Sequence, residues 1–230
     1  MKKILSVAVK TKDFLDILEI NQKLYNHDPA LSMVFVKDKD YLSFYTSNSR
    51  KKGLTVKHFL KIEWCKSKCE ELYPYFDQTG DTLFLRNCLK AFLENEIEEA
   101  ILNFYDTNFF QLVDHMKYYT FTIKHLFIFD EKTEKIFKQT PDFKFIPEYK
   151  YISQEDQNIM VSCTKSGVVK INNLEVKNSK ILPKKYIKIK IPKYLYNVLI
   201  EEDFVEVKKI DKFVYLQTAN KIYKIDKKVR

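Results

Sequence analysis

Glycine is scarce in this 230-residue chain, and its scarcity excludes several kinds of site. The three glycines, Gly53, Gly80 and Gly167, are scattered, so no glycine-rich loop is present to cradle a phosphate group. A serine nucleophile elbow and a His-Glu-x-x-His run are also missing. We therefore predict a binding protein and no enzyme activity.

Acidic side chains leave one catalytic class open. A nuclease needs only a few carboxylates that the fold brings together, and a sequence does not exclude such a site. Two acidic clusters follow predicted helices, at Glu96-Glu98-Glu99 and at Glu201-Glu202-Asp203. That placement is typical of helix-to-strand turns, and a nuclease with a hidden carboxylate site stays as the least favoured hypothesis.

Cysteine and histidine are few, with four of each. Cys65 and Cys69 form the one close pair, whereas a structural zinc site needs a second pair of ligands. Cys88 and Cys163 stand alone, with no histidine at ligand spacing. We expect reduced thiols, no metal and no cofactor.

Long hydrophobic runs are absent. The longest, Leu126 to Phe129, is far shorter than the about 20 residues of a membrane span. The basic start of the chain resembles a signal peptide only briefly, because Lys10, Lys12 and Asp13 interrupt the apolar run. With 45% hydrophobic and 31% charged residues, we expect a folded cytoplasmic protein without membrane association.

The net charge of +9 is one-sided. Residues 1–130 carry 18 Lys+Arg and 18 Asp+Glu, whereas residues 131–230 carry 22 Lys+Arg and 13 Asp+Glu. Such an excess is the electrostatic pattern expected for a polyanion partner. An A+T-rich genome also favours lysine codons, and lysine then serves simply to keep the protein soluble. Charge alone leaves both explanations open.

Strand and helix patterns repeat in the order β-α-β-β-β. The first unit has strand 3–10, helix 11–25, and strands 31–37, 41–47 and 54–62. In the second unit, 82–85 is a short strand or first helical turn, a helix of about ten residues follows, and the strands are 100–105, 109–113 and 118–126. The last unit has strand 186–191, a helix after Pro192, and strands 204–210, 213–218 and 221–227. We predict an α+β fold.

The segment 140–180 should hold one more unit. It offers strands at 143–152, 159–163 and 168–176. No amphipathic helix lies among them, because Ser153-Gln154-Glu155-Asp156 could start only a turn or two. The first half of the C-terminal domain is therefore expected to be degenerate.

This element order resembles that of the DNA sliding-clamp and processivity-factor family, which includes the bacterial β clamp, proliferating cell nuclear antigen and the T-even phage clamps. The best local matches are the segments 86–93 and 191–199, each followed by strands. The resemblance implies two clamp-like domains, 1–126 and 150–230, joined by a connector at 127–149. It implies sheets outside, helices on one face, and a six-domain ring that a two-domain chain closes as a homotrimer.

The resemblance also implies that double-stranded DNA is bound through its phosphates, without sequence specificity. The helices then contribute Arg86, Lys90 and Lys193. Four further lysines precede or lie in the last predicted repeat: Lys184, Lys185, Lys188 and Lys190. A loop contributes Arg50, Lys51 and Lys52. For each of these residues, a solvated polar face is the alternative explanation.

Sliding clamps hold DNA polymerase and other replication proteins by short peptides in an apolar groove near the connector. The matching residues here are Phe137, Phe143, Phe145 and Ile146, although core packing would also explain them. The implied source is a phage or virus, hence the bacterial cytoplasm or the host-cell interior.

Two departures from the family keep alternatives open. Ring clamps are commonly acidic, whereas this chain is basic, which is more similar to the clamp-folded processivity factors of herpesviruses. One helix is also missing. The second hypothesis is therefore a monomeric, basic nucleic-acid-binding accessory protein on another α+β fold.

Overall fold

The structure is a computed structural model of the chain. It describes residues 2–24, 31–37, 40–48, 54–67, 74–77, 79–106, 109–114, 117–122, 125–126, 140–176 and 180–226. The chain divides into two compact units, the first comprising Met1–Lys52 and Lys57–Phe129, the second Gly53–Val56 and Asp130–Arg230.

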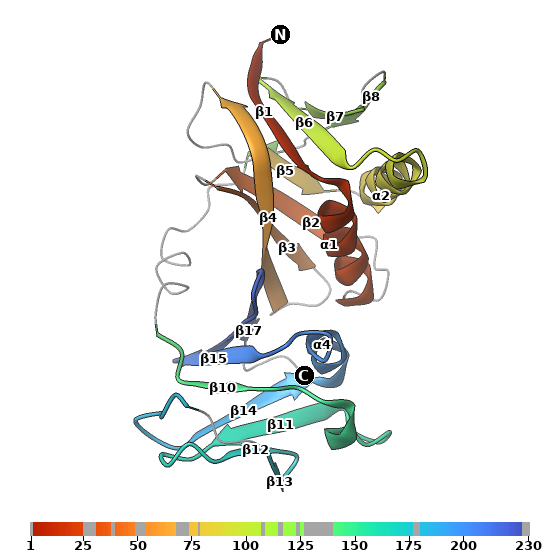
Figure 1. Ribbon diagram of the computed structural model, residues 1–230. Helices are drawn as coiled ribbons and strands as arrows, with labels where there is room; N and C mark the ends of the chain where they lie inside the picture. Colours follow the sequence, from red (N-terminus) through yellow and green to blue (C-terminus); the bar gives the residue numbers. More distant parts are fainter. Residues whose placement is uncertain are drawn as a thin grey trace. The chain divides into compact units, whose positions relative to one another are not determined.

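The first unit contains two helices and a series of antiparallel strands (Figure 1). Its elements are β1 (Lys3–Lys10), α1 (Thr11–Leu24), β2 (Leu31–Lys37), β3 (Tyr41–Asn48), β4 (Leu54–Ser67), β5 (Pro74–Asp77), α2 (Thr79–Glu94), β6 (Glu99–Tyr105), β7 (Phe109–Val113), β8 (Tyr118–Thr122) and β9 (His125–Leu126). One run of neighbours is β4-β1-β6-β7-β8, while β2 pairs with β3 and β5.

The second unit has one α-helix among its described residues. Its elements are β10 (Phe143–Phe145), the 3₁₀ turn η1 (Tyr149–Tyr151), β11 (Asn158–Cys163), β12 (Val169–Ile171), β13 (Leu174–Glu175), β14 (Ile187–Pro192), α4 (Lys193–Leu199), β15 (Val205–Ile210), β16 (Phe213–Gln217) and β17 (Lys221–Asp226). They form two runs, β13-β12-β11-β14 and β10-β15-β16-β17.

The two units repeat one pairing scheme. In the first, the opening strand β1 pairs with β6, and β2 pairs with β5. In the second, β10 pairs with β15, and β11 pairs with β14. Each unit is thus built from two halves whose strands pair across the halves, and the predicted α+β fold of repeated clamp-like units is confirmed.

The incomplete half is present, with a single 3₁₀ turn where the other halves have a helix. Residues 143–152 form β10 and η1 rather than one strand, and 168–176 form a hairpin, β12 and β13. Its turn residues Asn172 and Asn173 have φ of 48° and 70°, the left-handed region of a tight hairpin. The segment 82–85 is part of α2, which begins earlier than predicted, at Thr79.

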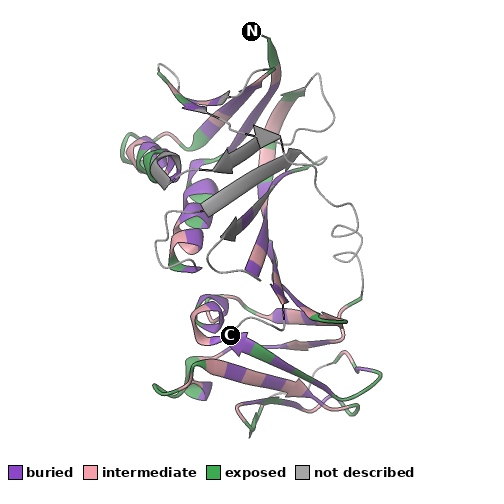
Figure 2. Ribbon diagram, turned by 180° about the vertical axis from the view of Figure 1, so that it is seen from behind, coloured by how far each residue is buried: buried purple, intermediate pink, exposed green. Residues whose placement is uncertain are grey.

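Alternation of apolar and polar residues decides which face each strand of the second unit buries. In β14, Ile187, Ile189 and Ile191 are buried, and Lys188 and Lys190 between them are exposed. Strand β11 alternates in the same way, and Figure 2 shows this banding along both strands. Since side chains on a strand alternate between faces, the lysines lie opposite the core.

Helices α1 and α2 contact each other, and each buries a stripe of apolar residues at helical spacing. The stripe on α1 includes Phe14, Ile17 and Leu18, and that on α2 includes Leu85 and Leu89, all nearly or fully buried. No helix in the described part of the chain has the length and apolar character needed to cross a membrane.

The side chain of Asn172 holds the degenerate half together. Its Oδ1 accepts the backbone N–H of Met160 at 2.9 Å, and its Nδ2 donates to the carbonyl of Tyr151 and to Asp156 Oδ2, each at 2.9 Å. These bonds link the β12–β13 turn to β11 and η1. The 3₁₀ turn is therefore positioned by side-chain hydrogen bonds rather than by a helix face.

Replacing Asn172 with alanine is expected to lower the free energy of unfolding by about 2–3 kcal/mol, because three part-buried hydrogen bonds are lost and alanine is strained at positive φ. Asn173→Ala is the matched control, since Asn173 is exposed and has the same left-handed backbone. Chemical denaturation of both variants measures the difference. Equal losses would contradict a role for the Asn172 side chain.

Candidate functional site

The helix pair α1–α2 carries two of the predicted DNA-binding residues, and both contact one carboxylate. Glu19 Oε1 lies 3.6 Å from Arg86 Nε and 3.2 Å from Lys90 Nζ. The Arg86, Lys90 and Glu19 side chains are 24%, 41% and 38% exposed. The Lys90–Glu19 pair is the more exposed of the two, and exposed pairs are worth at most about 1 kcal/mol, so a phosphate can compete for Lys90.

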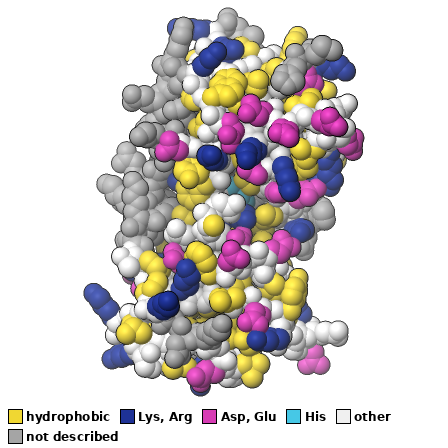
Figure 3. Space-filling model, viewed as in Figure 1, with side chains coloured by type: hydrophobic (Ala, Val, Ile, Leu, Met, Phe, Trp, Pro, Cys, Tyr) yellow, Lys and Arg dark blue, Asp and Glu magenta, His cyan; other side chains and the backbone are white. Residues whose placement is uncertain are grey.

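Charges on this side of the molecule are mixed. Figure 3 shows basic and acidic side chains interspersed rather than gathered into a single basic field. Around Glu19, two cations and one carboxylate leave a net charge of +1. The helix face of the first unit is therefore a weak attractor of polyanions.

Lys193 at the start of α4 is held by the protein itself. Its Nζ donates to the carbonyls of Ser153 and Gln154 at 2.9 and 3.0 Å, and its backbone N–H donates to Gln157 at 3.0 Å. The lysine thus ties α4 to the loop that follows η1. Binding to a phosphate would require its ammonium to give up these bonds.

Four of the remaining predicted basic residues lie on or just before β14. Lys184, Lys185, Lys188 and Lys190 are all exposed. Arg50, Lys51 and Lys52 lie outside the described residues. The structure therefore divides the predicted DNA-binding residues among α2, the start of α4, and the β14 strand with its preceding loop.

A cavity of about 600 Å³ lies beside β10 and η1 in the second unit. It is lined by Lys144, Phe145, Ile146, Glu148, Lys150, Tyr151, Glu175, Val176, Lys180 and Ile181. Of the predicted groove residues, Phe145 and Ile146 line it, and Ile146 is 46% exposed. Phe143 is fully buried in the core, and Phe137 lies outside the described residues.

The other apolar walls of this cavity were missed from the sequence. Tyr151 belongs to η1. Val176 and Ile181 lie thirty positions further along the chain than Ile146 and Tyr151. No local pattern joins these segments, because the hairpin β12–β13 brings them together. Basic groups sit at the rim, where Lys144 Nζ lies 3.1 Å from the centroid of the Phe204 ring and 3.9 Å from Glu206.

The buried titratable groups are packed in the core. Burial raises the pKa of Cys88 to about 11 and that of Tyr196 to about 12, and it raises the pKa of Cys163. A raised thiol pKa keeps cysteine protonated and unreactive at neutral pH. The Tyr196 hydroxyl accepts a hydrogen bond from the backbone N–H of Glu148 at 3.3 Å. This bond connects α4 to the residue that precedes η1.

His58 belongs to a buried polar cluster in the first unit. Its Nε2 lies 3.0 Å from Asn21 Oδ1, which also accepts the Thr46 hydroxyl at 3.0 Å. All three residues are fully buried, so the cluster joins α1 to β3 and β4. Within the part of the chain that the structure describes, no three His, Cys, Asp or Glu side chains gather as a metal site.

Comparison with protein families and with curated proteins finds no match. Solved structures do match. A Helicobacter pylori β clamp with 3,4-difluorobenzamide aligns at a TM-score of 0.69 and 10% identity, over 96% of this chain and 64% of that one. A Helicobacter pylori β clamp bound to a DNA ligase peptide aligns at 0.66 and 11%, over 96% and 66%. The Bacillus subtilis polymerase sliding clamp aligns at 0.63 and 9%, over 97% and 64%.

These likenesses extend over nearly all of this chain, and they show that its fold is that of the sliding clamps. The chain spans less than two thirds of the length of each of these clamps, at 64 to 66%. The resemblance noted from element order is therefore confirmed at the level of the fold.

Proposed function

We propose that this chain, which has the sliding-clamp fold, is a DNA sliding clamp or a clamp-folded processivity factor and has no enzymatic activity of its own. The observation that carries the proposal is the pairing scheme repeated in both units, together with the TM-score of 0.69 over 96% of the chain. Such a protein acts as a scaffold that keeps a polymerase on double-stranded DNA.

DNA binding in this proposal is electrostatic and independent of sequence. The helices supply Arg86, Lys90 and Lys193, whose present bonds are to Glu19 and to two loop carbonyls. Each cation has to exchange these bonds for a phosphate contact, which keeps DNA binding weak enough for a protein that must slide. The exposed lysines Lys184, Lys185, Lys188 and Lys190 and the loop residues Arg50, Lys51 and Lys52 are the other proposed phosphate contacts.

The cavity beside β10 is the proposed site for partner peptides. Its walls Phe145, Ile146 and Tyr151 are apolar or aromatic, and its volume of about 600 Å³ suits one or two anchoring side chains. The clamp of Helicobacter pylori has been solved with a DNA ligase peptide, which supports a peptide of a DNA polymerase or another replication protein as the occupant. The domain assignment 1–126, 127–149 and 150–230 remains part of the proposal, although residues 143–145 of the connector form β10.

The proposal includes a homotrimer, in which three such two-unit chains make up a six-domain ring. We therefore expect light scattering to give a mass near three times 27.6 kDa at several concentrations and at two salt levels. A phage or viral source and a cytoplasmic site of action belong to the same proposal. A monomer under every condition would contradict the homotrimer and favour the second candidate, an open, basic processivity factor, which the net charge of +9 supports.

A further inference from the structure

Basic charge in the second unit is concentrated on one segment. Between Asp156 and Glu201 the chain has nine lysines, and Glu175 is the one carboxylate between those two acidic residues. This segment contains the sheet β13-β12-β11-β14 and α4. The corresponding strands of the first unit, residues 31–77, carry nine Lys+Arg and six Asp+Glu. The excess is thus a property of this segment rather than of the fold.

Strand register places three of these lysines on the same face. Ser162 of β11 lies between Lys170 of β12 and Lys188 of β14, and Met160 lies opposite Lys190. Adjacent strands are about 4.8 Å apart, and alternate residues on a strand about 7 Å apart. Lys170 and Lys188 are therefore about 10 Å apart, and Lys188 and Lys190 about 7 Å apart.

This lysine face, defined by Lys170, Lys188 and Lys190, has little counter-charge. Within the part of the chain that the structure describes, none of the three forms an ion pair, whereas lysines elsewhere, such as Lys90, Lys208 and Lys221, contact carboxylates. Glu175, opposite Lys170 at the sheet edge, is the acidic residue on this face. Like charges this close repel, which an anionic ligand relieves.

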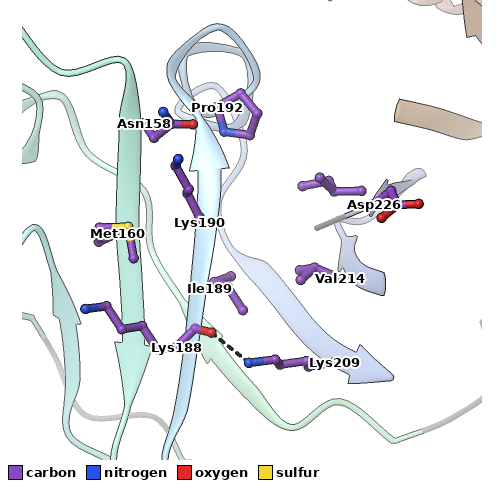
Figure 4. A pocket seen from close by; sticks show the side chains of 10 residues that line it. Asn158, Met160, Lys188, Ile189, Lys190, Pro192, Lys209, Val214 and Asp226 are labelled. Carbon is purple, nitrogen blue, oxygen red and sulfur yellow. Dashed lines mark hydrogen bonds between the residues drawn. The ribbon is translucent and has the colours of Figure 1, made fainter. Parts of the chain in front are cut away.

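A cavity of about 300 Å³ adjoins the lysine face (Figure 4). Lys188 and Lys190 of β14 and Lys209 of β15 line it, and Lys209 Nζ donates to the Lys188 carbonyl at 2.9 Å. Asn158 adds an amide, and Asp226 is the acidic lining residue. Tyr186, the residue just before β14, is 56% exposed. It is an even number of positions from Lys188 and Lys190, so its aromatic ring borders the lysine face.

We propose that the lysine face, which removes Lys188 and Lys190 from the clamp's own set of phosphate contacts, is a second nucleic-acid site that binds the phosphate backbone on the side of the sheet opposite its buried core. The charge, the spacing of the lysines and the bordering tyrosine all suit a polyphosphate strand, since aromatic rings accept stacked bases. The site does not depend on ring closure. It accommodates nucleic acid that is not threaded through a clamp, such as a displaced strand or an adjoining duplex.

The test is fluorescence anisotropy with a labelled single strand of about 20 nucleotides and a duplex of about 20 base pairs, between about 50 and 200 mM salt. The variant Lys170→Thr/Lys188→Thr/Lys190→Thr is expected to bind at least about tenfold more weakly at the low salt, with a salt slope reduced by about one per lysine. The matched control, Lys3→Thr/Lys10→Thr/Lys61→Thr, removes the same charge from exposed strand positions of the first unit.

Weaker binding of the single strand alone would identify displaced strands as the ligand, and weaker binding of both would identify the backbone in general. Equal affinity of the triple variant and its control for both oligonucleotides would overturn the proposal. So would preferential binding of polyglutamate, which would indicate an acidic protein partner. Short, open-ended oligonucleotides do not report ring closure, so this result is separate from that of the proposed clamp function.

Discussion

On a linear duplex whose ends are blocked after the protein has threaded onto it, the protein is expected to remain bound through a high-salt wash that removes it from open-ended DNA. Salt weakens phosphate contacts steeply, so only topological linkage survives the wash. A ring assembled from three chains can leave by sliding off an end, and a bulky block prevents this. The difference in retained protein is expected to be at least about tenfold.

The design has three arms on the same immobilised duplex: open ends, ends blocked after the protein is added, and ends blocked before it is added. Retention is measured as the amount of protein on the DNA after the wash. Only the second arm should retain the chain, because a ring threads from an end. Equal retention in all three arms would contradict a closed ring and leave an open processivity factor as the explanation of the fold.

The Lys221→Met variant is expected to lose about 3–5 kcal/mol of unfolding free energy, because it leaves a carboxylate buried without its cation. Lys221 Nζ donates to Glu202 Oε1 at 2.7 Å, and the two side chains are only 8% and 14% exposed. The bond joins the end of α4 to β17. The double variant Lys221→Met/Glu202→Leu should recover most of the loss, since an apolar pair needs no desolvation of charge.

An exposed ion pair of similar length is the control. Lys150 lies 2.6 Å from Glu148, with side chains 63% and 42% exposed, and the hydrogen bond that Lys150 donates to Glu148 raises the pKa of Lys150. Lys150→Met should leave the urea midpoint unchanged, because water replaces the lost partner. Equal shifts for Lys150→Met and Lys221→Met would show that burial does not decide the cost.

The buried Lys221–Glu202 ion pair also bears on the nuclease hypothesis. Glu202 belongs to one of the two acidic clusters that a hidden carboxylate site could use, and the structure engages it with Lys221. A carboxylate neutralised in this way is unsuited to holding a catalytic cation. The double variant Lys221→Met/Glu202→Leu therefore allows two properties to be measured separately: the free energy of unfolding, and any metal-dependent cleavage of DNA.

Periodicity alone placed most of the main elements, although it missed β5 (Pro74–Asp77). The alternating Ile and Lys residues of 187–191 predict a strand with one buried face, and β14 has that face. The apolar stripe with Phe14 and Leu18 predicts α1. These signals are local, since a strand or helix places its own side chains at fixed intervals. The absence of an amphipathic helix pattern in the segment 140–180 likewise predicted the incomplete half.

The candidate sites depended on contacts between distant segments, which no local pattern encodes. Arg86 and Lys90 were chosen as free cations, but Glu19 from α1 lies against both. Lys193 was chosen for its charge, and its ammonium instead binds two loop carbonyls. Phe143 and Phe145 looked equivalent, yet only Phe145 reaches the cavity.

The sequence by itself determined most of the strands and helices, the faces that they bury, and the excess of positive charge in the last hundred residues, because these follow from spacing and composition. Only the tertiary structure decided which strands pair, as β10 does with β15, and which lysines share one face, as Lys170, Lys188 and Lys190 do. Strand register is set by packing across residues far apart in the chain, and that packing brings the lysines together.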